Sequence, residues 1–225
     1  MRLVLVRHGD AYAGLAGIIA GPRGCAGLTP LGREQAAALR DDLAATGRIT
    51  ADVLTASVLP RAIETAEIIA PALGFDVVHQ DCDLCEVHTG DADGLDWAVY
   101  TDRFGPLDMA AEPERVFAPG GESWRSFHER VDRLLDRLAA EYEDQTVVAV
   151  CHAGVIAASI VTRFGIDRPG TGAQLRPFNT GLTYWEHDPR LDRWTLHGFN
   201  DVRHLDERHL AKRETMQKER KRDER

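Results

Sequence analysis

The sequence predicts an α/β protein, a three-layer α/β/α sandwich around a mostly parallel central sheet. Two observations indicate this. Short apolar runs such as residues 3–6 and 146–150 have the length of buried strands. Between such runs lie longer segments whose apolar residues repeat at helical spacing. Strands that alternate with helices are typical of a parallel sheet covered by helices on both faces.

The first strand and the first long helix are marked by their end residues. Residues 3–6 (Leu-Val-Leu-Val) predict a short buried strand. Farther on, Thr29 is a typical N-cap and Pro30 a typical first helical residue, so a helix is expected to begin there. The residues that favour this helix are Leu31, Gln35, Leu39 and Leu43.

The same order of strand and helix follows in the next segment. Residues 52–54 predict a second strand. A helix then begins at Pro60 and ends near Gly74, because proline favours the first helical turn and glycine the helix end. Residues 75–79 predict a further strand.

The second half of the chain contains the clearest helix. Its apolar residues fall three or four apart, at Trp124, Phe127, Val131, Leu134, Leu135, Leu138 and Tyr142. A strand at 146–150 and an apolar helix at 155–164 follow. Residues 181–186 and 193–197 predict a closing antiparallel hairpin.

Length and charge limit the classes of protein. The chain has 225 residues and a formal net charge of −9, which disfavours nucleic acid and anionic membranes as partners. No apolar run approaches the roughly 18 residues of a membrane span, and residues 3–6 are too short for a signal peptide core. We therefore expect a cytoplasmic protein whose cysteines (Cys25, Cys82, Cys85, Cys151) are thiols. Residues 1–205 are expected to form one catalytic domain, followed by a charged tail at 206–225.

Two histidines stand at the ends of predicted strands. His8 follows the first strand and His152 follows the strand at 146–150, each next to a glycine-containing turn. In a parallel sheet the carboxyl ends of the strands lie at one edge, so both rings are expected there. Arg61 lies in the first turn of a helix, where a cation is unfavourable unless an anion binds. Together these residues predict a phosphate site.

Seven short motifs follow one another along the chain. They are Arg7-His8-Gly9, Leu28 to Ala36, Ser57 to Ala66, Glu86 with Gly90 and Gly94, Pro119 to Ser123, Val150 to Gly154, and Asn200 to Leu205. In this order and context they resemble the histidine phosphatase superfamily, also called the phosphoglycerate mutase-like family, over nearly all of residues 1–205.

The resemblance implies a role for each site residue. His8, kept neutral by neighbouring cations, would attack a phosphoryl group and become a phosphohistidine. Arg7, Arg61 and His152 would bind the phosphoryl oxygens, and neither a metal nor a cofactor is expected. Glu86 would protonate the leaving oxygen and later deprotonate the attacking water. The implied activity is that of a phosphomonoesterase acting on a small phosphorylated metabolite.

Two other functions remain open within the same family resemblance. One is a phosphoglycerate mutase-type phosphotransferase, and the other is a non-catalytic phosphate-binding module. The mutase is disfavoured because Asp10 to Gly14 lack the asparagine usual after the first motif, and because Arg103 and Arg115 do not form a paired basic cluster. A binding module has no need for a nucleophile and an acid together.

A few residues have two interpretations. Cys82, Cys85 and His88 have zinc-ligand spacing, but no second cysteine pair exists, so no metal is expected; a redox dithiol is the other alternative. Ser57 either helps to position phosphate or caps a helix. The long segments 10–28 and 90–119 are expected to build the site, and their apolar residues line a substrate site or pack in the core: Leu15, Ile18, Ile19, Trp97, Tyr100 and Phe104.

Overall fold

The central sheet has six strands in the order β3-β2-β4-β1-β5-β6. The computed structural model describes residues 1–109, 111–166 and 173–210. The strands are β1 (Arg2–Arg7), β2 (Val53–Ala56), β3 (His79–Gln80), β4 (Thr146–Cys151), β5 (Leu182–Asp188) and β6 (Arg193–Asp201). β1 to β4 pair in parallel, whereas β5 runs antiparallel to β1 and to β6. The closing hairpin is thus confirmed.

The helices lie between these strands in the predicted order. They are α1 (Tyr12–Ala16), α2 (Pro30–Thr46), α3 (Pro60–Ile69), α4 (Trp97–Phe104), α5 (Trp124–Glu141) and α6 (Ala153–Arg163), with short 3-10 turns η1 (Ala70–Leu73), η2 (Cys82–Leu84) and η3 (Gly90–Ala92). α2 begins as predicted, because the Thr29 hydroxyl accepts a hydrogen bond from the Gly32 N–H at 3.0 Å.

One strand prediction is wrong in extent. Residues 75–79 were expected to form a strand, but β3 comprises only His79–Gln80, opposite Thr55 and Ala56 at the end of β2. β2 is itself only 4 residues long, so little strand edge remains for pairing. Phe75 and Val78 instead pack as loop residues against the core.

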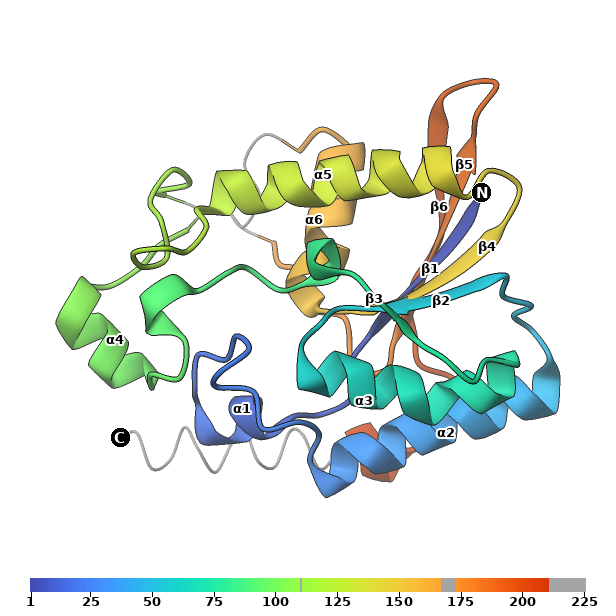
Figure 1. Ribbon diagram of the computed structural model, residues 1–225, viewed down its shortest axis with the longest axis horizontal. Helices are drawn as coiled ribbons and strands as arrows, with labels where there is room; N and C mark the ends of the chain where they lie inside the picture. Colours follow the sequence, from blue (N-terminus) through green and yellow to red (C-terminus); the bar gives the residue numbers. More distant parts are fainter. Residues whose placement is uncertain (110, 167–172, 211–225) are drawn as a thin grey trace.

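Alternation along the central strands creates two separate core layers. Leu3 and Leu5 of β1 belong to the cluster with α5 and α6. Val4 and Val6 belong to the cluster with α2 and α3. Successive strand residues point to opposite faces, so each face of the sheet is covered by one helix pair, as Figure 1 shows. The predicted three-layer, mostly parallel α/β fold is confirmed.

The two segments that sequence patterns left unassigned lie against each other. The Ile19 N–H donates to the Leu95 carbonyl and the Gly94 N–H to the Ile19 carbonyl, both at 2.8 Å. A small apolar cluster around buried Tyr100 packs behind them. In Figure 1 these segments, with α1 and α4, lie at the left of the sheet, on the side toward which β1 runs. They therefore flank the carboxyl ends of the strands.

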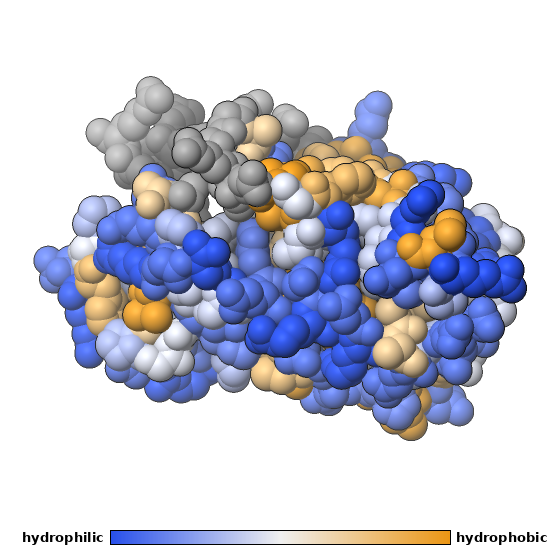
Figure 2. Space-filling view, turned by 90° about the horizontal axis from the view of Figure 1, so that it is seen from above, coloured by the Kyte–Doolittle hydropathy of each residue, from blue (hydrophilic) through white to orange (hydrophobic). Residues whose placement is uncertain are grey.

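The surface seen in Figure 2 is mainly hydrophilic, with smaller apolar areas. None of the described helices is both long enough and apolar enough to cross a membrane. The proposed boundary between residues 1–205 and the tail at 206–225 stays a prediction, because residues 211–225 lie outside the described part of the chain.

Candidate active site

Parallel pairing of β1 with β4 places the two predicted histidines side by side. Arg7 is in register with Cys151, so His8 and His152 are the next residues on adjacent strands. Their ring centroids are 5.0 Å apart, with 58° between the ring planes. The expectation that both rings emerge at one edge of the sheet is therefore confirmed.

The His8 ring is held in one orientation and one tautomer. Its Nδ1 lies 2.7 Å from the Gly9 carbonyl oxygen, and since a carbonyl only accepts, the proton is on Nδ1. Its Nε2 then carries the lone pair, which accepts a hydrogen bond from the Arg61 Nε at 3.2 Å. The backbone is fixed as well: Asn179 Nδ2 donates to the His8 carbonyl at 2.9 Å, and the Gly9 N–H donates to the Thr65 hydroxyl at 3.0 Å.

Arg61 lies where the sequence places it, in the first turn of α3, and only 6% of it is exposed. Besides His8, it donates from Nη1 to the Ala20 carbonyl at 3.1 Å. Arg7, at the end of β1, donates from Nη1 to the Pro177 carbonyl at 2.7 Å. Two guanidinium groups and the N-terminus of α3 thus bring positive charge to the histidine pair, which favours an anion.

His152 is completely buried beside these cations. Burial, followed by the positive charge of Arg61, lowers the pKa of His152 well below its ordinary value, so the ring is neutral. Its Nε2 is 2.8 Å from the Ser57 hydroxyl oxygen. Its Nδ1 is buried and has no hydrogen-bond partner within the described residues. Ser57 also accepts from the Leu59 N–H at 3.3 Å, so both contacts expected of Ser57, to the site and to the helix start, are present.

Glu86 comes to the site from a loop. Its Oε2 accepts a hydrogen bond from the Gly154 N–H at 3.0 Å, in the first turn of α6 and two residues after His152. A carboxylate is favourable at a helix N-terminus. A Cβ at Gly154 would overlap the Glu86 carboxylate, so glycine at this position leaves room for the carboxylate beside the histidine.

A buried ion pair holds the backbone around Glu86. Arg130 of α5 donates from Nε and Nη2 to the Glu122 carboxylate at 2.7 and 2.8 Å. The same guanidinium donates to the carbonyls of Asp83, Cys85 and Glu86 at 2.6, 3.1 and 3.3 Å. Burial opposes the ionisation of Glu122, but hydrogen bonds from Arg130 and the His88 N–H outweigh it, so its pKa stays below the ordinary value.

Several residues around the site were not singled out by sequence patterns. They are Thr65, Glu122, Arg130 and Asn179, and each is a positioning residue in the contacts described above. Thr65 and Glu122 lie within two of the seven motifs, and Arg130 lies on the predicted apolar stripe of α5 and is 7% exposed. Asn179 acts through a contact between segments far apart in sequence.

The apolar candidates divide between core and surface. Ile19 and Tyr100 are buried in the small cluster behind the site and serve as packing residues, as one of the two interpretations expected. Trp97 is 45% exposed and Leu15 49% exposed. Ile18 and Phe104 are half-buried, so these two and the exposed side chains retain surface that a substrate can contact.

A histidine lone pair beside buried Arg61 and half-buried Arg7, at the carboxyl ends of parallel strands, suits a ligand that carries a phosphoryl group. The chain belongs to the histidine phosphatase superfamily, branch 1, whose family model matches residues 3–202. The resemblance noted in the sequence is therefore confirmed.

Individual relatives agree with this assignment. The chain is 36% identical over 176 residues to a bifunctional protein of Mycobacterium tuberculosis, which covers 78% of this chain but 46% of that protein, so the chain spans about half its length. It is 28% identical over 206 residues to the metal-independent phosphoserine phosphatase of Arabidopsis thaliana, covering 90% of this chain and 82% of the relative. Mycobacterial glucosyl-3-phosphoglycerate phosphatase, solved with VO3, superposes with a TM-score of 0.71 at 29% identity, covering 88% of this chain and 98% of that one.

Proposed function

We propose that this chain is a metal-independent phosphomonoesterase that hydrolyses a small phosphorylated metabolite through a phosphohistidine at His8. The observation that carries the proposal is the Nδ1 contact of His8 with the Gly9 carbonyl, because it leaves the Nε2 lone pair as the nucleophile. Family membership and phosphatase relatives support the same activity.

In the first step, His8 Nε2 forms a bond to phosphorus as the bond from phosphorus to the ester oxygen breaks. Glu86 in its protonated form donates a proton to the leaving oxygen. In the second step water attacks the phosphohistidine, the ionised Glu86 takes the water proton, and inorganic phosphate leaves with His8 restored. One carboxyl group thus supplies and recovers the proton.

The surrounding cations stabilise the charge of the transferring phosphoryl group. Arg61 lies next to Nε2 in the structure, and its guanidinium is the nearest recorded donor for an equatorial oxygen. Arg7 adds a second positive charge. The Nδ1 atom of His152, which has no partner elsewhere in the described chain, donates to a third oxygen when the hydroxyl proton of Ser57 turns from Cys85 Sγ, 3.3 Å away, to His152 Nε2.

Hydrolysis is a better fit than mutase chemistry. Arg115, one of the few basic residues of the segment beside α4, is held by its own loop: it donates to the carbonyls of Pro106 and Phe104, both at 2.6 Å, and to Glu112 at 3.0 Å. Its guanidinium is thus already engaged within its own loop and does not present a free cation for the carboxylate of a glycerate substrate.

We also infer a cytoplasmic location, since all four cysteines are thiols.

The test is phosphate release from a panel of aryl, sugar, serine and glycerate phosphates in excess chelator. We expect wild type to release phosphate, the His8→Ala variant to lose at least about 10³-fold in rate, and wild type to acquire an acid-labile phosphoryl group that the variant lacks. His79→Ala, on the exposed edge strand, is the control. Activity that requires added metal, or survives in His8→Ala, would refute the proposal; phosphoryl exchange between glycerates without release would indicate the mutase.

A further inference from the structure

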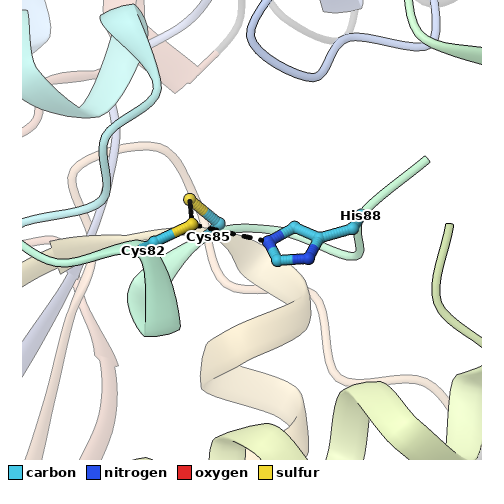
Figure 3. Close-up of side chains that lie close together, drawn as sticks. All are labelled: Cys82, Cys85 and His88. Atoms are coloured by element: carbon cyan, nitrogen blue, oxygen red, sulfur yellow. Dashed lines mark hydrogen bonds between the residues drawn. The ribbon is translucent and has the colours of Figure 1, made fainter. Parts of the chain in front are cut away.

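A second group of reactive side chains lies beside the site and has no part in the proposed mechanism. Figure 3 shows Cys82, Cys85 and His88 turned toward one another, and their ligand atoms all lie within 4.8 Å of each other. Cys82 Sγ is 3.8 Å from Cys85 Sγ and 3.7 Å from His88 Nε2. The sequence disfavoured a metal here because a second cysteine pair is lacking, but spacing alone could not show how these atoms are arranged.

These separations match the edges of a tetrahedral zinc site. Zn–S bonds of about 2.3 Å and Zn–N bonds of about 2.0 to 2.1 Å place neighbouring ligand atoms about 3.5 to 3.8 Å apart in tetrahedral geometry. A disulfide instead requires sulfurs about 2.05 Å apart. The arrangement of the two thiols is therefore that of ligands around one ion rather than of a bonded pair.

The local fold sets this arrangement without a metal. The 3-10 turn η2 begins at Cys82, with Asp81 as its N-cap, and the Cys85 N–H donates to the Cys82 carbonyl at 3.0 Å. This turn brings residues three apart onto one side. Arg130 then holds the Cys85 carbonyl at 3.1 Å, and the Ser57 hydroxyl donates to the Cys85 thiol at 3.3 Å.

A carboxylate also lies near the other nitrogen of the histidine, just beyond hydrogen-bond distance. The Glu122 Oε2 lies 3.7 Å from His88 Nδ1 and accepts the His88 backbone N–H at 2.8 Å. A carboxylate behind a histidine is the usual outer-shell arrangement at zinc, because it orients the ring and makes the ligating nitrogen more basic.

We propose that Cys82 Sγ, Cys85 Sγ and His88 Nε2 form a zinc-binding site next to the phosphoryl site, with Ser57 between the two, since its hydroxyl contacts both Cys85 Sγ and His152 Nε2, at 3.3 and 2.8 Å. On binding, both thiols release their protons to solvent and three protein ligands surround the ion. Within the described residues no fourth cysteine, histidine or carboxylate joins the group. Because Cys82 is exposed, solvent reaches the ion, and a water molecule occupies the fourth coordination position. Glu86 lies between Cys85 and His88 in the sequence. A bound ion therefore links the two ends of the short segment that carries Glu86.

The proposal is tested with Co²⁺ and Zn²⁺ on full-length protein kept reduced by a phosphine. We expect one Co²⁺ per chain, with thiolate charge-transfer and tetrahedral d–d absorption that Zn²⁺ abolishes by displacement. Cys82→Ser and His88→Ala should each weaken Zn²⁺ affinity at least about tenfold in competition with a chromophoric chelator, a loss typical of removing part of a metal site. Zn²⁺ should also raise the melting temperature of wild type.

Cys25→Ser and His79→Ala are the matched controls, because each removes the same kind of side chain away from the cluster. They should bind as wild type does. Absence of the thiolate bands, or bands that persist unchanged in both Cys82→Ser and His88→Ala, would overturn the proposal. Far-ultraviolet circular dichroism checks that each variant is folded, so the outcome is independent of the proposed phosphatase activity.

Discussion

The two halves of the candidate active site are built in different ways. The strand edge carries His8 and His152, which are 8% and 0% exposed, on adjacent hydrogen-bonded strands. Glu86 is half-buried on an irregular segment and depends on hydrogen bonds from two other elements, the Gly154 N–H of α6 and the Arg130 guanidinium of α5. The backbone ladder thus fixes the phosphoryl-binding half, whereas a single buried ion pair, Arg130 with Glu122, fixes the acid-bearing half.

This difference has a consequence for how each half responds to change. Replacing a side chain at the strand edge removes a charge or a nucleophile but leaves its neighbours held by the sheet. Replacing the ion pair releases a whole segment, because one guanidinium satisfies three carbonyls there. Substitutions in the first half are therefore expected to lower the reaction rate without much loss of stability. Substitutions of the ion pair are expected to lower both the stability and the precision with which Glu86 is placed.

The largest effect tests the strand-edge half. Arg61→Ala should lower kcat by about 10² to 10³-fold on every ester, because it removes a donor to the transferring phosphoryl group. Arg33→Ala is the control, since Arg33 of α2 is exposed and forms an ion pair with Glu64 of α3. A loss below about tenfold for Arg61→Ala would remove this residue from the phosphoryl site.

The next effect tests the acid. Glu86→Gln keeps an oxygen that can accept from Gly154 but cannot transfer a proton, so kcat should fall about 10²-fold on alkyl phosphates. Aryl phosphates have leaving groups that need little protonation, and their loss should stay below about tenfold. Rates on both series, measured at one pH, check this. Equal losses would contradict a general-acid role.

A smaller effect tests the ion pair. Arg130→Met should lower the free energy of unfolding by about 3 kcal/mol, because it removes the cation that pairs with the half-buried Glu122 carboxylate and leaves three carbonyls without their donor. Arg137→Met on the same helix is a matched control, since Arg137 pairs with Asp81 and Asp83 but is 42% exposed, and should cost less than about 1 kcal/mol. Urea unfolding of wild type and both variants measures the two losses in free energy of unfolding. In the fraction of the protein that stays folded, Arg130→Met should lower the turnover of alkyl phosphates more than the turnover of aryl phosphates, as we expect for Glu86→Gln.

The smallest effect concerns pH and the support of the strand edge. His204 Nε2 lies 2.9 Å from the Thr180 hydroxyl, and the Thr180 N–H donates to the Arg7 carbonyl at 2.9 Å. Burial lowers the pKa of His204 from 6.5 to about 4, so between these values the unfolded chain binds a proton that the folded chain does not. The contribution of neutral His204 to the free energy of unfolding is therefore complete above pH 6.5 and is lost as the pH falls toward 4.

We expect His204 to contribute about 1 to 2 kcal/mol of this pH dependence, because the ring is partly exposed. Urea unfolding of wild type and His204→Asn at several pH values between 7 and 4 measures it. The variant should show the weaker dependence on pH. An identical slope in both proteins would show that another group is responsible.

The sequence by itself determined the α/β class, the order of the elements and the two strand-end histidines. These features depend on local patterns, such as the alternation of Val and Leu in β1 or the Thr29 cap of α2, that hold wherever the segment packs. Even Glu86 was found, through its place in a family motif. The strand at 75–79 failed because strand length depends on the available partner edge, and β2 offered little.

Tertiary structure decided everything that depends on contacts between distant segments. Asn179 on the His8 carbonyl, Arg130 on the Glu86 segment and Glu122 behind His88 join residues separated by 171, 44 and 34 positions. A pattern of apolar residues records which side of an element is buried, but not which partner a polar side chain meets there. The zinc-like arrangement of Cys82, Cys85 and His88 illustrates this, because spacing gives candidate ligands and only the fold brings their atoms to coordination distance.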